Sequence, residues 1–301
     1  MKSLTTLFAL SVALTAVVRG EELRLGASIP ARSLVPLLER AFSGARPATR
    51  LVTEVTDTAK VLDRVRSEQI QVGILTRNLK QPELEEIPAL VAQPIGTDAL
   101  VLTVPASNPV KGLTGDQIRA IWAGAIVNWR ELGGPDLPIQ VIGRTKKYDP
   151  IQLFGDFMKL ESQFGESSAQ FRVKGQPAWS ATKALVFDSD EAALRALLGD
   201  AGAISYFPIA RFLDDQANRV AIKGLVLDGV EATAATVADK GAYYLRRTLN
   251  VFTKGPPDAA SKDFIQFILS VEGQQLISNA GFMPLTAAAA VREFRTTNHR
   301  P

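Results

Sequence analysis

Strand and helix patterns alternate through the first quarter of the chain, and this alternation constrains the fold more than any other feature. Short apolar or alternating runs at residues 23–27, 50–55 and 71–75 have the composition of strands. Between them, residues 34–42 and the stretch after residue 58 carry apolar side chains at helical spacing. Strands joined through helices pair in parallel, in a sheet that helices cover. The sequence therefore predicts an α/β fold with ligands at the loops after the strands.

Residues 141–158 predict a strand, a basic loop and a helix start in succession. Gly143 ends an apolar run, and Arg144, Lys146 and Lys147 then place three cations within four positions. The next pair, Asp149-Pro150, suits the cap and the first position of a helix. A helix start presents free N–H groups and the positive end of a dipole, which favour an anion. The alternative interpretation is a solvated basic turn with an ordinary cap.

The residue inventory disfavours several classes of enzyme and partner. The chain has no cysteine, and its single histidine is His299 in a polar tail. It therefore lacks a thiolate nucleophile, a Ser-His-Asp triad and the usual zinc ligands. The net charge of +3 falls to +1 without Lys2 and Arg19, which is too small to indicate nucleic acid. We expect no catalytic residue, no metal, no cofactor and no nucleic-acid partner.

Residues 1–20 are typical of a secretory signal peptide. Lys2 supplies the positive start, and residues 7–18 form the apolar core. This run is shorter than the roughly 20 residues that a membrane span needs, although an inner-membrane anchor is the alternative. We expect secretion to the periplasm, with cleavage near residue 20 or after Ala16.

Five later segments resemble those of a known family in their order and spacing. They are GASIPARSLVPLLERAF at 26–42, VGILTRNL at 72–79, LTGDQIRAIWAGAIVNW at 113–129, GAISYF at 202–207 and FIQFILSVEGQQLISNAGFMPL at 264–285. By these segments the chain resembles the PstS-like phosphate-binding family of type II periplasmic binding proteins. The members of that family are the soluble substrate-binding receptors of ABC importers.

The resemblance implies a bilobed fold of two doubly wound sheets joined by two crossover segments, with the ligand held in the cleft between them. Residues 21–103 and 245–285 would form lobe 1, residues 104–244 would form lobe 2, and residues 286–301 would be a C-terminal tail. The resemblance also implies phosphate transport, a small oxyanion such as phosphate as ligand, and an ABC permease in the inner membrane as partner. We expect a monomer that is not an enzyme.

The resemblance places the anion ligands on loops at the ends of strands. Ser28 and Ile29 fall in the first loop, Thr56 and Thr58 in the second, and Thr76 and Arg77 in the third. In the fourth loop, Arg144 matches an arginine that relatives use against a phosphate oxygen. It is followed by Lys146, Lys147, Tyr148 and Asp149.

At residues 148–150 the sequence departs from the family pattern, because Tyr148-Asp149-Pro150 stands where relatives have Ser-Gly-Thr. The second loop also lacks the Ser-Gly run of relatives. Tyrosine is bulky, aspartate adds a like charge, and proline has no N–H group. We therefore expect this loop to disfavour phosphate. A binding fold with a degenerate anion site, acting as a sensory, adhesive or assembly module, is the alternative. An enzyme such as a phosphatase would lack general-base and metal candidates.

Overall fold

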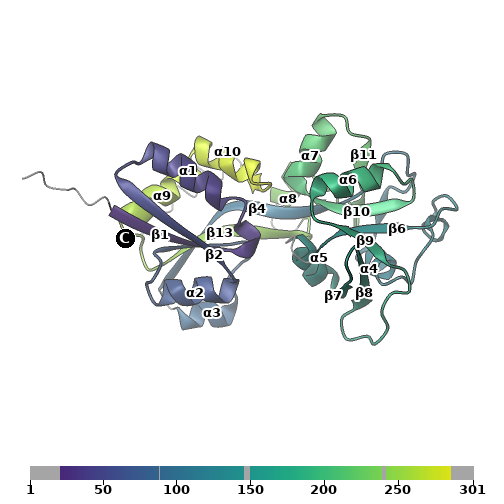
Figure 1. The fold of residues 1–301 in the computed structure, drawn as a ribbon, viewed down its shortest axis with the longest axis horizontal. Helices are drawn as coiled ribbons and strands as arrows, with labels where there is room; N and C mark the ends of the chain where they lie inside the picture. The colour runs from purple at the N-terminus through teal and green to yellow at the C-terminus, as the bar shows by residue number, and fades with distance from the viewer. Residues whose placement is uncertain (1–20, 88, 146–149, 239–241, 286–301) are drawn as a thin grey trace, which may run out of the picture.

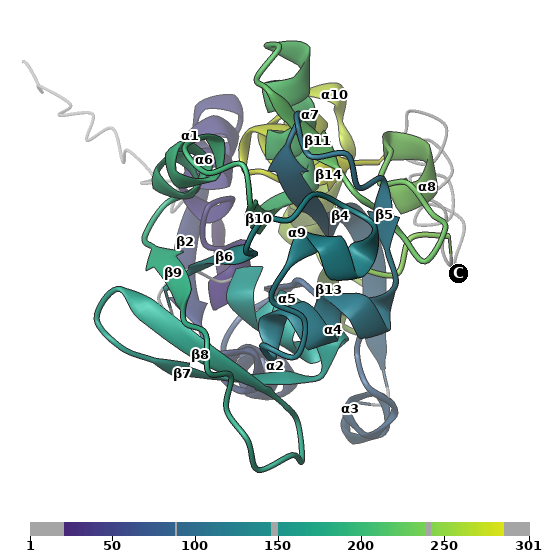
Figure 2. The same cartoon turned by 90° about the vertical axis from the view of Figure 1, so that its right-hand side faces the viewer.

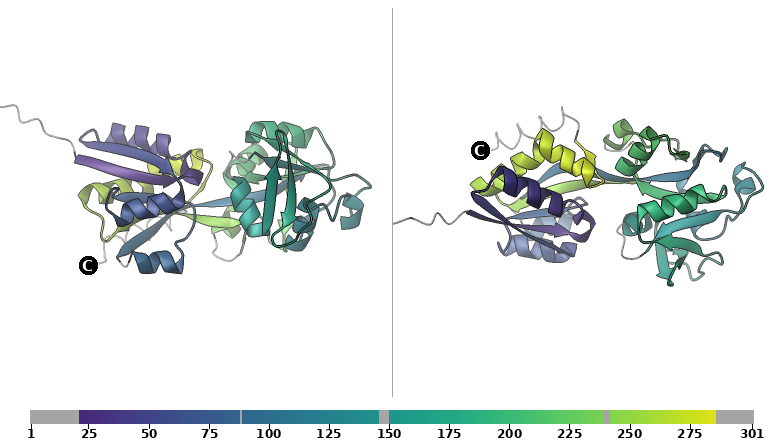
Figure 3. Two further views of the ribbon diagram at one scale, coloured as in Figure 1. Left: turned by 60° about the horizontal axis from the view of Figure 1, so that its bottom comes forward. Right: turned by 45° about the horizontal axis from the view of Figure 1, so that its top comes forward.

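The computed structural model describes residues 21–87, 89–145, 150–238 and 242–285. These residues form two lobes, each with its own hydrophobic core (Figure 1). Two long strands, β4 (Leu90–Pro105) and β13 (Arg246–Lys254), run from one lobe to the other. Figure 3 shows these strands between the lobes from two further directions. The predicted bilobed α/β fold with two crossover segments is confirmed.

Lobe 1 starts with the parallel strands that the alternating pattern predicts. Its elements are β1 (Glu21–Ser28), the 3-10 turn η1 (Ile29–Ala31), α1 (Val35–Ala45), β2 (Thr49–Thr56), α2 (Thr58–Arg66), β3 (Val72–Leu75) and α3 (Gln81–Glu86). Strand β1 lies between β2 and β3 and is parallel to both, with Leu25 opposite Thr53 and Val72. The chain returns at its end to add α9 (Ala259–Leu269), α10 (Val271–Asn279) and β14 (Met283–Pro284).

Strand β4 belongs to the sheets of both lobes. Its first half pairs antiparallel with β13, from Leu90 opposite Lys254 to Ala99 opposite Arg246. Its second half pairs antiparallel with β10 (Ala203–Pro208) and β11 (Ile222–Gly224). The two predicted sheets therefore share β4 and form one hydrogen-bonded path in the order β2-β1-β3-β13-β4-β10-β6-β9-β8-β7.

Lobe 2 places helices around a mixed sheet. Its remaining elements are β5 (Gly112–Leu113), α4 (Gly115–Trp122), η2 (Trp129–Leu132), β6 (Gln140–Arg144), α5 (Pro150–Met158), β7 (Leu160–Phe164), β8 (Ser168–Val173), β9 (Ala184–Phe187), α6 (Asp190–Leu198), α7 (Ile209–Ala217), β12 (Val226–Leu227) and α8 (Ala234–Ala238). A capping box of Thr114 and Gln117 starts α4. Figure 2 looks onto this lobe, with the β7–β8 hairpin at the lower left.

The cores of the two lobes meet along the crossing strands. Ile95 of β4 and Leu249 of β13 pack in the lobe 1 core, whereas Ala99 and Leu245 pack in the lobe 2 core. The predicted lobe boundaries at residues 103/104 and 244/245 stay predictions. On β4 the change of core lies closer to the N-terminus than that boundary.

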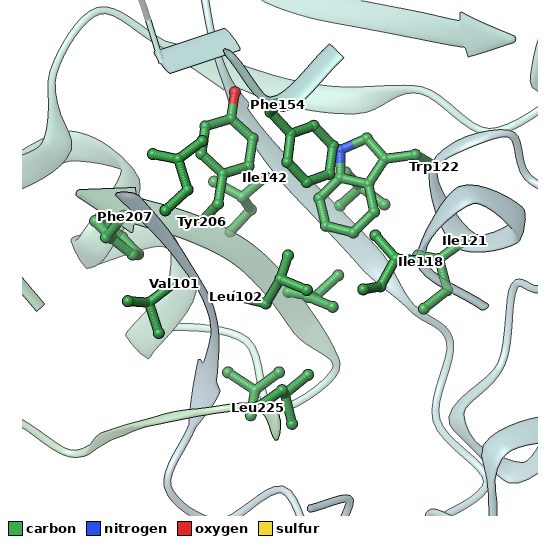
Figure 4. Packing of buried hydrophobic residues seen from close by; sticks show 14 of the residues in the cluster. Val101, Leu102, Ile118, Ile121, Trp122, Ile142, Phe154, Tyr206, Phe207 and Leu225 are labelled. Carbon is green, nitrogen blue, oxygen red and sulfur yellow. The ribbon is translucent and has the colours of Figure 1, made fainter. Parts of the chain in front are cut away.

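Aromatic rings form the centre of the lobe 2 core (Figure 4). The Phe154 ring stacks on Tyr206 at 4.6 Å between centroids and lies 4.7 Å from Trp122. This packing fixes α4 and α5 against β10, and so fixes where the ends of the lobe 2 strands lie. None of the helices in the described ranges is long and apolar enough to cross a membrane.

Candidate functional site

A cavity of about 260 Å³ lies between the lobes, beside the ends of β1 and β10. Lobe 1 contributes residues from η1 and from the end of α10, and lobe 2 contributes the starts of α6 and α7. The lining residues are Pro30, Arg32, Ser33, Asp98, Asp190, Pro208, Arg211, Asn279, Ala280, Gly281 and Phe282. Both lobes line it, so any change in their separation would change its size.

Three predicted ligands of lobe 1 come together at the carboxyl edge of its sheet. Ser28 is the last residue of β1 and lies opposite Thr56, the last residue of β2. Ala27 pairs with Ile74 of β3, which places Thr76 next to the same edge. Ser28 and Thr76 are buried, whereas Ile29 is exposed. This edge is the place at which a doubly wound sheet binds ligands.

The Ser28 hydroxyl is buried and has no hydrogen-bond partner among the described residues. Ser28 stands at the N-cap of η1, yet its side chain makes no capping hydrogen bond. Leaving a buried hydroxyl unpaired costs about 1–3 kcal/mol. An acceptor or donor from a bound molecule would remove that cost.

The second loop is occupied by its own helix cap. The carboxylate of Asp57 accepts a hydrogen bond of 2.9 Å from the Lys60 N–H at the start of α2. This contact lowers the pKa of Asp57. Thr58 is the first residue of that helix. Since Asp57 accepts from one of the free N–H groups, the start of α2 has fewer N–H donors available for an anion than an uncapped helix would have.

The guanidinium of Arg77 is paired inside lobe 1. Its Nη1 and Nη2 donate to the two carboxylate oxygens of Glu83 at 2.8 and 2.5 Å. Nη1 also donates to the Asn78 carbonyl at 2.8 Å. The pair is partly exposed, with 30% of the Arg77 side chain and 21% of the Glu83 side chain accessible. The hydrogen bonds from Arg77 are the main cause that lowers the pKa of Glu83.

Arg144 is buried, which corrects the expectation that it belongs to an open basic loop. It is the last residue of β6, and its side chain is 0% exposed. Its Nε and Nη2 donate to Asp190 Oδ1 at 2.9 and 2.7 Å. The other donors reach the Gly143 carbonyl at 3.3 Å, Ser205 Oγ at 3.3 Å and the Tyr206 carbonyl at 3.2 Å. The role of Arg144 as an anion ligand stays a prediction.

The Arg144–Asp190 pair is further stabilised by an aromatic ring and by a helix start. The Phe207 ring centre lies 4.7 Å from the Arg144 Cζ, a distance at which an aromatic face attracts a cation. Asp190 is the first residue of α6, where the helix dipole favours a negative charge. Asp190 is not among the site residues that the sequence predicts. The sequence signal that could have identified Asp190 is an acidic residue directly after a serine that caps a helix.

The predicted residues Lys146, Lys147, Tyr148 and Asp149 lie outside the described residues, as do the predicted leader and the tail at 286–301. The described residue next to them, Thr145, donates from Oγ1 to Asp188 Oδ1 at 2.5 Å. In the ranges that the structure describes, no three histidine or carboxylate side chains gather as a metal site.

The charged residues that line the interlobe cavity are balanced in sign, since two are cations and two are anions (Arg32, Arg211, Asp98 and Asp190). Asp98 accepts from Arg247 at 2.9 Å, and Asp190 accepts from Arg144. Arg211 donates to Asp215 at 2.8 Å and also pairs with Glu191. Opposite charges close together weaken the field at a distance. These residues therefore do not form a strongly positive pocket for a dianion.

Comparison with known proteins places the chain among binding proteins. A family model described as a PBP superfamily domain matches residues 19–272. The phosphate-binding protein PstS of Bacillus subtilis is 24% identical over 281 residues, covering 91% of this chain and 86% of that protein. The phosphate-binding protein PstS of Pseudomonas aeruginosa is 26% identical over 251 residues, covering 74% of this chain and 71% of that protein.

Solved structures show the same fold. A possible phosphate-binding protein from Planctomyces limnophilus superposes with a TM-score of 0.73 at 20% identity, covering 93% of this chain and 98% of that one. An ABC-type phosphate transport receptor from Vibrio cholerae gives 0.71 at 21% identity, covering 87% of this chain and 99% of that one. The resemblance to the PstS-like family that the five sequence segments indicated is confirmed.

Proposed function

The chain belongs to the PBP superfamily, and we propose that it binds phosphate or a related small oxyanion between its lobes and delivers it to an ABC permease. On this proposal the leader is removed near residue 20, and the mature protein works in the periplasm as a monomeric receptor without catalytic activity. The relatives named as phosphate-binding proteins and as a phosphate transport receptor support this function.

The observation that carries the proposal is the unpartnered hydroxyl of Ser28. It lies buried at the carboxyl edge of the lobe 1 sheet, next to the predicted ligands Thr56 and Thr76. A hydroxyl can donate to an oxyanion, and the Ser28 hydroxyl has no hydrogen-bond partner among the described residues. Of the predicted ligands, Ser28 is therefore the one whose side chain is most available to bind an oxyanion.

The test is a thermal-shift and calorimetric screen of phosphate, sulfate and nitrate against the wild type and Ser28→Ala. A ligand at 100 times its dissociation constant should stabilise the wild type by about 2.7 kcal/mol. Ser28→Ala should weaken binding about tenfold, the value of one hydrogen bond to a charged group. It should not destabilise the unliganded protein, because the hydroxyl has no partner to lose.

Ser180→Ala is the matched control. Ser180 is also buried, but its hydroxyl donates to the Thr182 carbonyl at 2.8 Å and accepts from the Phe171 N–H at 3.1 Å. This variant should lose stability and keep its oxyanion affinity. A wild type that no oxyanion stabilises would contradict the proposed function.

A second candidate function has its own structural support. Arg77 and Arg144 both pair with carboxylates of the chain itself, and Asp57 caps the start of α2. These contacts favour a binding fold whose anion site is degenerate and which acts as a sensory, adhesive or assembly module. The same screen separates the two functions, since only a working receptor responds to oxyanions.

A further inference from the structure

We infer that Asp190 is an internal counter-anion, which occupies Arg144 and closes the end of the interlobe cavity to oxyanions from outside. The inference rests on the proposed function only in taking the external ligand to be an oxyanion. It makes Asp190 a specificity-determining residue, because an external anion must displace its carboxylate to reach Arg144.

The hydrogen bonds of Arg144 account for all of its donors. A guanidinium carries five N–H groups, one on Nε and two on each terminal nitrogen. Nε donates to Asp190, Nη1 donates to the Gly143 carbonyl and Ser205, and Nη2 donates to Asp190 and the Tyr206 carbonyl. Two of the five bonds end on one oxygen, Asp190 Oδ1. Of these acceptors, Asp190 is the only one that carries a charge.

The position of Asp190 makes it the barrier between Arg144 and the cavity. Asp190 lines the cavity and Arg144 does not. The Asp190 side chain is 10% exposed, whereas that of Arg144 is 0% exposed. A molecule in the cavity therefore meets the carboxylate before it can approach the guanidinium.

The carboxylate is not needed to cap its own helix. Ser189 is the N-cap of α6, and its Oγ accepts from the Ala192 N–H at 3.2 Å. Removing the Asp190 side chain would leave the cap in place. It would also leave a carboxylate-sized space that faces a buried cation and a helix start, both of which favour an anion.

The test compares Asp190→Ala with Asp215→Ala, using formate, acetate and phosphate as probes in thermal-shift and calorimetric titrations. Asp215 is a matched control, since it is also buried and paired with an arginine. Its partner, Arg211, lines the same cavity but keeps Glu191 as a second partner when Asp215 is removed. Asp190→Ala should melt below the wild type and recover with formate or acetate in a saturable way. The affinity of Asp190→Ala for these anions should exceed that of the wild type about tenfold or more. Asp215→Ala should show no such gain.

Two further variants keep the inference falsifiable. In Asp190→Ala with Arg144→Met the anion response should disappear, because the cation is gone. If Asp190→Ala does not fold, Asp190→Asn keeps the shape and removes the charge, and its phosphate affinity should still exceed that of the wild type. A response shared with Asp215→Ala, or retained without Arg144, or an unchanged affinity in Asp190→Asn would overturn the inference.

The outcomes also distinguish this inference from the proposed function. If the wild type binds no oxyanion and Asp190→Ala does, the proposed function fails and the inference holds. If the wild type binds phosphate and the Asp190 variants bind it equally well, the proposed function holds and the inference fails.

Discussion

Arg77 and Arg144 come from equivalent places in the two lobes, yet their environments differ. Each lies at the end of a parallel strand, and each pairs with a carboxylate in the first turn of a helix, Glu83 in α3 or Asp190 in α6. Arg77 is partly exposed and its partner is six residues away. Arg144 is fully buried and its partner is 46 residues away.

The difference shows what burial adds to an ion pair. A partly exposed pair gains little, because water and salt already solvate and screen the separate charges. A buried pair must hold together, since either charge alone would be desolvated without compensation. The two arginines look alike as anion ligands in the sequence, but only Arg144 has a fully buried side chain.

The largest expected effect in this comparison is that of Arg144→Ala. It leaves the Asp190 carboxylate without its guanidinium partner and removes five hydrogen bonds. The free energy of unfolding should fall by about 3–5 kcal/mol, measured by urea denaturation. The double variant Arg144→Ala with Asp190→Ala should lose less, because it removes both charges. A loss below about 1 kcal/mol in the single variant would show that the pair is not structural.

The overall fold was predictable because local patterns and tertiary structure agree. The strands at 23–27, 50–55 and 71–75 were each found within a residue or two, because buried strands are short apolar runs and half-buried strands alternate. The capping box of Thr114 marked the start of α4. The β7–β8 hairpin was not predicted. Strand β7 is at the sheet edge, and most residues of β7 and β8 are at least partly exposed, so neither strand forms a buried apolar run.

The candidate site was less predictable, because its chemistry depends on pairs that only the fold brings together. Ser28 was placed correctly at the end of β1, since the strand itself marks that position. Arg144 was assigned to an open loop because three cations follow Gly143 closely in sequence. Its burial depends on Asp190, on the carbonyl of Tyr206 and on the ring of Phe207, all of which come from later segments.

The loss of stability in Ser189→Ala should be smaller, and it tests the helix cap of α6 apart from the neighbouring ion pair. Ser189→Ala removes the cap of α6 and leaves Arg144 and Asp190 unchanged. The free energy of unfolding should fall by about 1 kcal/mol, as measured by urea denaturation. Ser189→Asp, which keeps a capping oxygen, should restore most of it. A loss as large as that of Arg144→Ala would mean that the cap contributes as much to stability as the pair does.

The smallest effect should be that of Arg77→Ala. The pair with Glu83 is partly exposed, so its removal should cost less than about 1 kcal/mol at low salt. At 1 M NaCl, where the screening length is about 3 Å, this cost should nearly vanish. The cost of Arg144→Ala should persist at the same salt concentration, because a buried pair is poorly screened. Equal salt dependence of the two variants would contradict the comparison.

The pH dependence of stability in Arg77→Ala tests the same pair through the titration of Glu83. Hydrogen bonds from Arg77 lower the pKa of Glu83 below its ordinary value of 4.5, together with the Lys80 N–H and against the effect of burial. A carboxyl group whose pKa is lower in the folded state stabilises that state above the ordinary pKa. It loses this contribution as the pH falls through the folded value. The difference in unfolding free energy between wild type and Arg77→Ala should therefore be constant near neutral pH and shrink below about pH 4.5. The control Glu83→Gln should remove the pH dependence of that difference. A difference that stays constant down to pH 2 would show that Arg77 stabilises the protein through packing alone.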